Sequence, residues 1–144
     1  MGFKFGLQKL LDMREDKEEE SKRLFNDSQR KLQETQAKKE EMKSQYEKYS
    51  GINKGESLVY QKIKKNYLFA LDKGLAQIDK EIEAKTKEVD FRRNDFKQKQ
   101  IERKTVEILR DKQQAEYIAA ENYKESVQND EFALYAYMRN KEVG

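Results

Sequence analysis

The sequence predicts an all-α fold in which two long helices form an antiparallel coiled-coil hairpin, with the second helix longer than the first. Three observations support this prediction. The 144-residue chain contains no proline, the residue that stops a helix most reliably. Apolar residues recur at alternating spacings of three and four on both sides of a central segment. Turn-forming residues cluster between the two helical patterns in that segment alone.

The composition argues against a compact enzyme fold. Only 35% of the residues are hydrophobic and 41% are charged, which is too little apolar volume for a globular core. A disordered chain tolerates such a composition, but disordered segments are usually enriched in proline. The 31 basic and 28 acidic residues leave a formal charge of +3, so charge alone does not indicate nucleic-acid binding. We expect neither a signal peptide nor a membrane-spanning segment, because no apolar run is long enough.

The predicted turn is the segment Ser50-Gly-Ile-Asn-Lys-Gly55. We expect one elongated coiled-coil domain over residues 1–144, with a first helix over about 4–49, a turn over about 50–56 and a second helix over about 57–139. Gly74 lies inside a strong periodic pattern, which favours close packing or a contact surface at that position over a break.

The apolar seam of a left-handed coiled coil can be followed along both helices. On the first helix it takes in Leu7, Leu11, Arg14, Glu18, Ser21, Phe25, Ser28, Leu32, Thr35, Lys39, Met42, Tyr46 and Tyr49. On the second helix it takes in Leu68, Leu71, Leu75, Ile78, Ile82, Lys85, Val89, Arg92 and Phe96. The first seam has a polar middle, and the second is more apolar.

A turn centred on Asn53 would set the register of the hairpin. The expected neighbours are Phe25 with Ile82, Leu32 with Leu75, Met42 with Ile63, and Leu11 with Phe96. The same rule puts residue 3 near residue 103, so the second helix should extend beyond the first by about 50 Å. Its unpaired apolar residues would require a partner, either another protein or a second copy of this chain; fraying or folding back is the alternative.

No catalytic chemistry is indicated. The chain has no cysteine and no histidine, and it contains no phosphate-binding loop and no metal-ligand spacing. Its carboxylate runs are typical of solvated helix faces, because a two-helix rod has no desolvated cleft. The basic stretch over 92–112 is interrupted by acidic residues. It is compatible with a solvated face, with docking to an acidic protein or with nucleic-acid binding. We expect a non-enzymatic protein without cofactor or metal.

Tyrosines flank the predicted turn on both arms: Tyr46, Tyr49, Tyr60 and Tyr67. Some can fill the seam, but a two-helix rod leaves several of them at the surface, where tyrosine is a frequent interface anchor.

Short motifs at both ends and after the turn resemble the flagellar type III export protein FliJ family. They are Phe3-Lys-Phe-Gly-Leu-Gln-Lys-Leu-Leu-Asp-Met-Arg14 with Glu18, Leu71-Asp-Lys-Gly-Leu75, and Asp130-Glu-Phe-Ala133 with Met138-Arg139. The resemblance spans the full length. It implies a cytoplasmic coiled-coil stalk, similar to the central shaft of rotary ATP synthases, at the inner face of the cell membrane.

The resemblance implies three kinds of protein partner: the hexameric export ATPase FliI, which the stalk would bind and stimulate, the export gate protein FlhA, and substrate-specific export chaperones. Nucleic acid is not among them, and the membrane is reached only through these proteins. The sequence is also compatible with a homodimer. The alternatives are an injectisome stalk protein and a nucleic-acid-associated coiled coil.

Site residues carry over from the resemblance by position. The export-gate candidates are Met42, Tyr46, Tyr49, Tyr67, Leu71, Gly74 and Ile78. Leu71 and Ile78 are also seam positions, which conflicts with a role on the surface. The ATPase-binding candidates come from the N-terminus and the overhanging helix. They are Phe3, Phe5, Leu7, Leu11, Arg103, Val106, Leu109, Arg110, Tyr117, Phe132, Met138 and Arg139.

Overall fold

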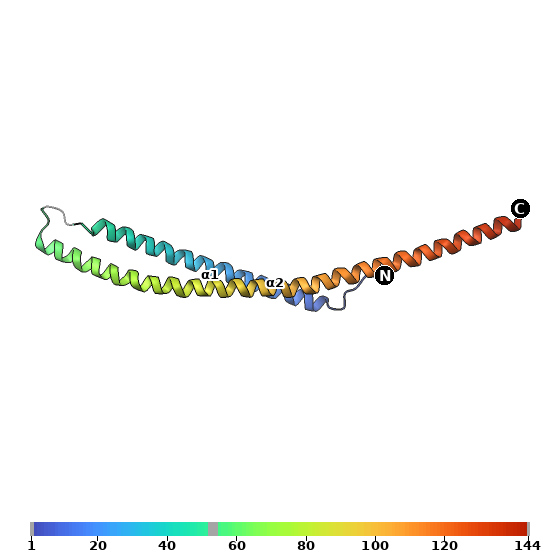
Figure 1. Cartoon of the computed structure of the whole chain (residues 1–144), viewed down its shortest axis with the longest axis horizontal. Coiled ribbons are helices and arrows are strands. Elements are labelled where there is room, and N and C mark those ends of the chain that lie inside the picture. The colour runs from blue at the N-terminus through green and yellow to red at the C-terminus, as the bar shows by residue number, and fades with distance from the viewer. Residues whose placement is uncertain (1, 52–54, 144) are drawn as a thin grey trace. The chain divides into compact units, whose positions relative to one another are not determined.

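The computed structural model describes residues 2–51 and 55–143. Helix α1 spans Gln8–Tyr49 and helix α2 spans Leu58–Val143 (Figure 1). With 86 residues, α2 is about twice as long as α1, which has 42. The described residues contain no strand. The predicted all-α class with a longer second helix is confirmed.

Helix α1 begins at Gln8, later than the predicted start near residue 4. The preceding segment contains Gly2 and Gly6, and glycine disfavours helix because its backbone loses the most conformational freedom on ordering. Two backbone hydrogen bonds join this segment to the start of the helix, from Gln8 N to Phe5 O at 3.2 Å and from Leu11 N to Leu7 O at 3.0 Å.

Helix α2 begins directly after Ser57, which is its N-cap. The Ser57 Oγ accepts a hydrogen bond from Tyr60 N at 3.1 Å and so satisfies one of the free donors of the first turn. The helix continues to Val143, beyond the predicted end near 139. No proline or glycine follows Gly74 until the last residue of the chain, so nothing in the sequence stops the helix earlier.

The chain divides into two compact units, each containing a part of both helices. We call Lys17–Lys99 the hairpin unit, and Met1–Asp16 together with Gln100–Gly144 the terminal unit. The expectation of a single domain over residues 1–144 is not tested by this division and stays a prediction.

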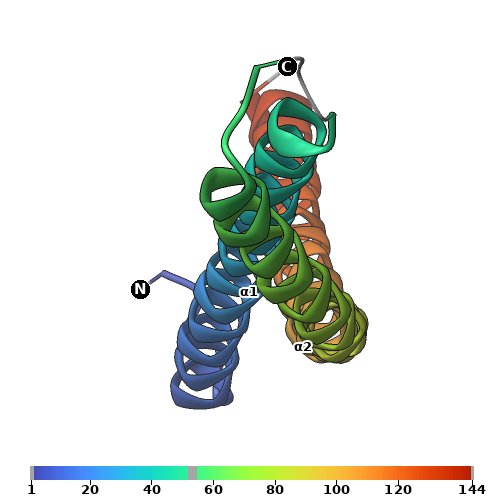
Figure 2. The ribbon, with the colours of Figure 1, turned by 90° about the vertical axis from the view of Figure 1, so that its left-hand side faces the viewer.

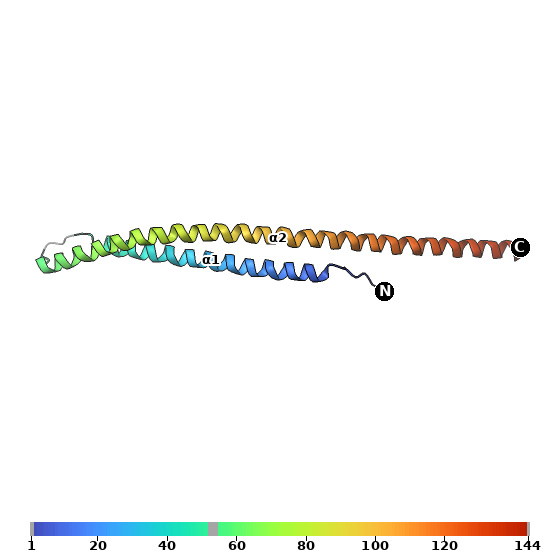
Figure 3. The same ribbon diagram turned by 90° about the horizontal axis from the view of Figure 1, so that it is seen from below.

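In the hairpin unit, α1 and α2 lie side by side and run in opposite directions (Figures 1 and 3). Contacts along the unit fix this order, because residue numbers rise on one helix as they fall on the other. The contacts are Phe25 with Phe96 (ring centroids 6.1 Å apart), Lys39 with Asp79 (Nζ–Oδ1 2.6 Å) and Tyr49 with Tyr67 (ring centroids 5.6 Å apart).

The predicted seams of the hairpin unit face the opposite helix. All nine seam positions from Leu68 to Phe96 are buried or half-buried, and so are the α1 positions from Glu18 to Met42. The polar middle of the α1 seam is accommodated because its hydroxyls donate to carbonyls one turn earlier. These bonds are Ser21 Oγ to Glu18 O (2.8 Å), Ser28 Oγ to Phe25 O (2.7 Å) and Thr35 Oγ1 to Lys31 O (2.9 Å).

The predicted register is wrong. Phe25 contacts Phe96 instead of Ile82, and Met42 lies beside Gly74 instead of Ile63. The first turns of α2 extend past the end of α1, because Tyr49, the last residue of α1, contacts Tyr67 and not the first residues of α2. Asn53, on which the expected turn was centred, lies outside the described residues.

The described part of the connection is fastened to α2 by Lys64. Its Nζ donates to Gly51 O and pairs with Glu56 Oε1 at 3.2 Å, and both side chains of this ion pair are largely buried. Figure 2 looks onto this end of the hairpin unit, with the beginning of α2 and the end of α1 in front.

In the terminal unit, the N-terminal residues pack against the part of α2 that ends near residue 117. Leu11 is completely buried, and Val106 is 4% exposed. The Phe3 and Tyr117 ring centroids are 5.7 Å apart, and Arg14 Nη1 donates to Glu102 O at 2.8 Å. The prediction that α2 is unpaired from about residue 103 is therefore wrong, because the register places residue 3 beside residue 117.

Beyond this packed part, every residue of α2 from 118 to 142 is exposed. Seven of these residues are large apolar or aromatic side chains at or above half exposure. They are Ile118, Tyr123, Phe132, Leu134, Tyr135, Tyr137 and Met138. An unpaired, partly apolar C-terminal helix is thus present, but it is shorter than the sequence predicts.

Candidate interaction surfaces

The described residues contain no group of three or more side chains that could hold a metal ion. Among them there is also no helix long and apolar enough to cross a membrane. The features that stand out are two exposed apolar surfaces, one in each unit.

The first surface is the beginning of α2, which we call the tip and define as residues 58–67. Leu58, Val59 and Ile63 are 83%, 70% and 60% exposed, and Tyr60 and Tyr67 are exposed as well. The sequence predicted exposed tyrosines here but did not predict the exposed aliphatic residues. Their exposure could have been inferred from their position before Leu68, the first residue of the predicted α2 seam. The wrong register hid this, because it placed Ile63 opposite Met42.

Tyrosines join the tip to the end of α1. The Tyr49 ring meets the Tyr67 ring at 87°, which is an edge-to-face arrangement that favours aromatic pairs. The Tyr67 hydroxyl bonds to Gln45 Oε1 at 3.2 Å. Tyr46 remains exposed, although it is a predicted seam position. This end of the hairpin unit therefore presents aromatic side chains on both helices.

The second surface is the exposed C-terminal part of α2, residues 118–142. Near its end, an open pocket of about 440 Å³ is lined by Phe132, Tyr135, Met138, Arg139 and Glu142. Spacings of three and four put these side chains on one helix face. Phe132, Met138 and Arg139 were predicted as binding residues, whereas Tyr135 was not, although it has the same helical spacing.

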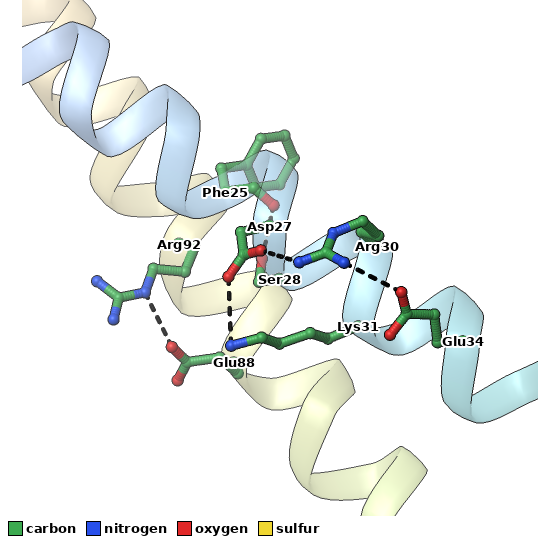
Figure 4. Close-up of polar contacts among 8 residues, drawn as sticks. All are labelled: Phe25, Asp27, Ser28, Arg30, Lys31, Glu34, Glu88 and Arg92. Carbon is green, nitrogen blue, oxygen red and sulfur yellow. Dashed lines mark hydrogen bonds and ion pairs between the residues drawn. The ribbon is translucent and has the colours of Figure 1, made fainter.

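One group of charges in the hairpin unit is balanced around Asp27. Figure 4 shows Asp27 between Arg30 and Lys31, with Oδ1 2.6 Å from Arg30 Nη2 and Oδ2 3.2 Å from Lys31 Nζ. The hydrogen bonds from Arg30 and then Lys31 hold the pKa of Asp27 below its usual value. Glu34 accepts a second bond from Arg30, at 3.1 Å.

The arginines of the basic stretch over 92–112 are likewise paired within α2. Carboxylates one turn away, or adjacent in sequence, pair with its arginines. The pairs are Arg92 with Glu88 (2.8 Å), Arg93 with Asp90 (3.1 Å), Arg103 with Glu107 (2.5 Å) and Arg110 with Asp111 (3.4 Å). Such pairing weakens the positive potential that nucleic-acid binding requires.

A comparison with protein families identifies the chain. The family model described as flagellar FliJ protein matches residues 3–142, which include almost all of both helices. The chain belongs to the FliJ family. Its membership makes it a component of the flagellar export apparatus, and the family is a non-enzymatic component of that apparatus. Among curated proteins, none matches the chain significantly.

The gate candidates that the FliJ resemblance implies fall into two groups in the hairpin unit. Tyr46 and Tyr67 are exposed, while Met42, Tyr49 and Gly74 are half-buried between the helices. Leu71 and Ile78 are buried in the seam. A direct contact between a partner and these last two would require the helices to separate, so the conflict noted in the sequence is real.

The ATPase-binding candidates that the FliJ resemblance implies divide in the same way. The exposed candidates are Leu7, Leu109, Phe132, Met138 and Arg139. Leu11 and Val106 are buried in the terminal unit and are not available to a partner without rearrangement. The remaining candidates are half-buried: Phe3, Phe5, Arg103, Arg110 and Tyr117.

Proposed function

We propose that this FliJ-family chain acts as a stalk that binds and stimulates the hexameric export ATPase through the C-terminal part of α2. The observation that supports this proposal is that every residue from 118 to 142 is exposed. This segment carries large apolar side chains and has no intramolecular partner helix among the described residues. Apolar side chains of this size are stabilised when a partner covers them.

The face around Phe132, Tyr135 and Met138 is the proposed anchor. Spacings of three place a phenylalanine, a tyrosine and a flexible methionine along one inclined line of the helix surface. Helix-in-groove recognition uses anchors at such spacings, and aromatic residues dominate the binding free energy of interfaces. Arg139 lies beside this line and suits an acidic group on the partner.

We further propose that the aromatic residues at the end of the hairpin unit contact the membrane export gate. Tyr46 and Tyr67 are exposed there, and Tyr49 lies against Tyr67. Tyrosine combines a large apolar ring with a hydroxyl and so suits a partly polar interface. Leu71 and Ile78 support this surface from the seam. Assistance to chaperones, a role in motility and placement at the inner face of the cell membrane complete the proposal and rest on family membership.

The ATPase proposal is tested by deleting residues 118–144, which leaves the paired part of the terminal unit intact. We expect stimulation of the ATPase to be lost and binding to the gate to persist. The triple variant Phe132→Ala/Tyr135→Ala/Met138→Ala should weaken ATPase binding by at least tenfold, since interface anchors contribute about 2 kcal/mol or more each. Tyr46→Ala/Tyr67→Ala is the matched control, with reduced gate binding and normal stimulation. Full stimulation by the truncated chain would contradict the proposal.

Two alternatives are distinguished by simple measurements. A homodimer through residues 118–142 would show a concentration-dependent mass in sedimentation, which the triple variant would abolish. A nucleic-acid-binding role would require duplex binding that survives physiological salt, and the local pairing of the arginines over 92–112 argues against it. The flagellar family match favours the flagellar apparatus over an injectisome.

A further inference from the structure

The tip combines exposed aliphatic side chains with unneutralised lysines. Residues 57–71 contain Lys62, Lys64 and Lys65 and no acidic residue. The Lys64 ammonium group is already bonded to Glu56 Oε1 and to Gly51 O. Lys62 and Lys65 are exposed and have no carboxylate partner among the described residues. This arrangement differs from the basic stretch over 92–112, whose arginines are paired along their own helix.

The apolar side chains of the tip point in several directions. At 3.6 residues per turn, Leu58, Val59 and Ile63 are spread over roughly 140° of the helix circumference. Tyr49, the last residue of α1, contacts Tyr67, so α2 extends past α1 by nine residues, or roughly 13 Å. A narrow apolar stripe would fit a groove on a protein, whereas apolar side chains spread over a wide arc, with a long lysine among them, fit a medium that surrounds the helix end.

The side chains within and beside this arc are those that stabilise a helix at a lipid–water interface. Lys62 lies between Leu58 and Val59 around the helix, and Lys65, Tyr60 and Tyr67 lie outside the arc. Tyr60 and Tyr67 have apolar rings with polar hydroxyls, and the long stems of Lys62 and Lys65 allow their ammonium groups to reach phosphates while the neighbouring apolar groups insert. A pocket of about 440 Å³ beside them, lined by all three lysines, has room for a headgroup.

We propose that the tip docks directly on an anionic lipid surface, with Leu58, Val59 and Ile63 inserted into the interface and Lys62 and Lys65 paired with lipid phosphates. The inference replaces the expectation that the chain reaches the membrane only through proteins. It does not depend on the proposed ATPase or gate contacts, and vesicle binding by the purified chain tests it separately.

The first test is flotation of the full-length chain with vesicles of pure phosphatidylcholine and with vesicles containing phosphatidylglycerol. We expect binding to the anionic vesicles that weakens with salt. Because each lysine near an anionic surface contributes about fivefold in partition, Lys62→Gln/Lys65→Gln should lower binding by on the order of tenfold or more. The matched control, Lys104→Gln/Lys112→Gln, removes two exposed lysines elsewhere on α2 and should change binding little.

The second test separates insertion from simple charge attraction. Val59→Ser/Ile63→Ser should reduce vesicle binding several-fold, whereas Val127→Ser/Leu134→Ser, two exposed apolar residues of the C-terminal part, should not. The chain has no tryptophan. A single Leu58→Trp variant should therefore report insertion by a blue shift and by quenching with brominated lipid, and Tyr135→Trp should show neither.

Each other outcome overturns the proposal. Failure of the unaltered chain to bind anionic vesicles would leave an acidic protein surface as the occupant of the tip. Equal binding to neutral and anionic vesicles, or equal loss in the tip and control variants, would show that the tip lysines and aliphatic residues do not recognise lipid. Retained ATPase stimulation together with absent vesicle binding would overturn this inference and leave the proposed function standing.

Discussion

The two parts of α2 on either side of residue 117 differ in environment and not in type of residue. Over 68–96 the helix places Leu71, Ile78 and Val89 against α1 in the hairpin unit. Over 118–142 it carries Ile118, Phe132 and Leu134 in the open. Both parts are regular helix with apolar residues at spacings of three and four. The difference is that only the first part has a partner helix within the chain.

This comparison shows that apolar residues at helical spacing have two separate uses in one protein. Where a partner helix is present they contribute to the stability of the hairpin, and where it is absent they are available for binding. Substitutions of the same kind in the two environments should therefore have different consequences.

The largest contrast is expected between Ile78→Ala and Ile118→Ala. Ile78 is 7% exposed, so losing its side chain removes buried apolar surface and leaves a cavity, at a cost of about 2–4 kcal/mol in the free energy of unfolding. Ile118 is 50% exposed, and its truncation should cost under about 0.5 kcal/mol. Urea unfolding followed by circular dichroism measures both. Similar losses for the two variants would mean that the C-terminal part has a hidden partner.

A smaller contrast is expected between two ion pairs. Lys64→Met leaves the Glu56 carboxylate largely buried without its cation, and Glu56 Oε2 is already buried without a partner among the described residues. We expect a loss of about 1–3 kcal/mol, with faster hydrogen exchange around residues 55–64. The Lys87–Glu83 pair is more than two-thirds exposed on both sides, so Lys87→Met should change stability by under about 0.5 kcal/mol.

The double variant Lys64→Met/Glu56→Gln provides the control for this pair. Replacing the carboxylate removes the unpaired charge and should restore part of the lost stability. No recovery would indicate that the packing of the lysine stem, and not the ion pair, holds the connection to α2.

Gly74→Ala should have a still smaller effect. A methyl group at this position would lie 2.5 Å from Met42 Cε, so the end of the methionine must move. Methionine is flexible, and alanine favours helix over glycine by about 1 kcal/mol, so the net change in stability should stay within about 1 kcal/mol. Gly74→Val, which is bulkier and branched at Cβ, should destabilise clearly in thermal unfolding. A large loss in the alanine variant would show that Met42 cannot yield.

The smallest effect concerns Asp27, whose pKa is lowered chiefly by Arg30. A lowered pKa in the folded state means that its stabilising pairs are fully present above the ordinary pKa of aspartate and are lost as the pH falls through the lowered value. Because the group is exposed, we expect little change in overall stability. Carboxyl NMR titration should show the shift, and Arg30→Gln should raise the pKa toward its usual value. An unchanged pKa in that variant would assign the shift to Lys31.

The sequence was sufficient for the helices and for the faces that pack, but not for the register. A seam with spacings of three and four can be displaced along its partner and still bring seam residues together. Phe25 can face Ile82 or Phe96, since both are seam positions two heptads apart. The choice between these two registers depends on where α2 begins. Ser57 caps the start of α2 and Lys64 binds Gly51 O, and neither contact can be read from the heptad pattern.

The same limit explains the errors in the candidate surfaces. Val106 was expected on an unpaired helix and is buried, while Leu58, Val59 and Ile63 were not recognised as a surface and are highly exposed. In the observed register α1 packs against residues nearer the C-terminal end of α2 than predicted. The beginning of α2 is therefore left without a packing partner. Tyr67 and Phe132 were placed correctly because either register leaves them at the surface.

By itself, the sequence determined that the chain forms two long helices, which residues form their apolar faces, and that no catalytic group stands out. Only the tertiary structure decided which of those faces are covered. The physical reason is that helix formation and amphipathicity depend on residues within a few turns of one another, whereas burial depends on the alignment of residues far apart in the chain. That alignment left both the tip and residues 118–142 exposed.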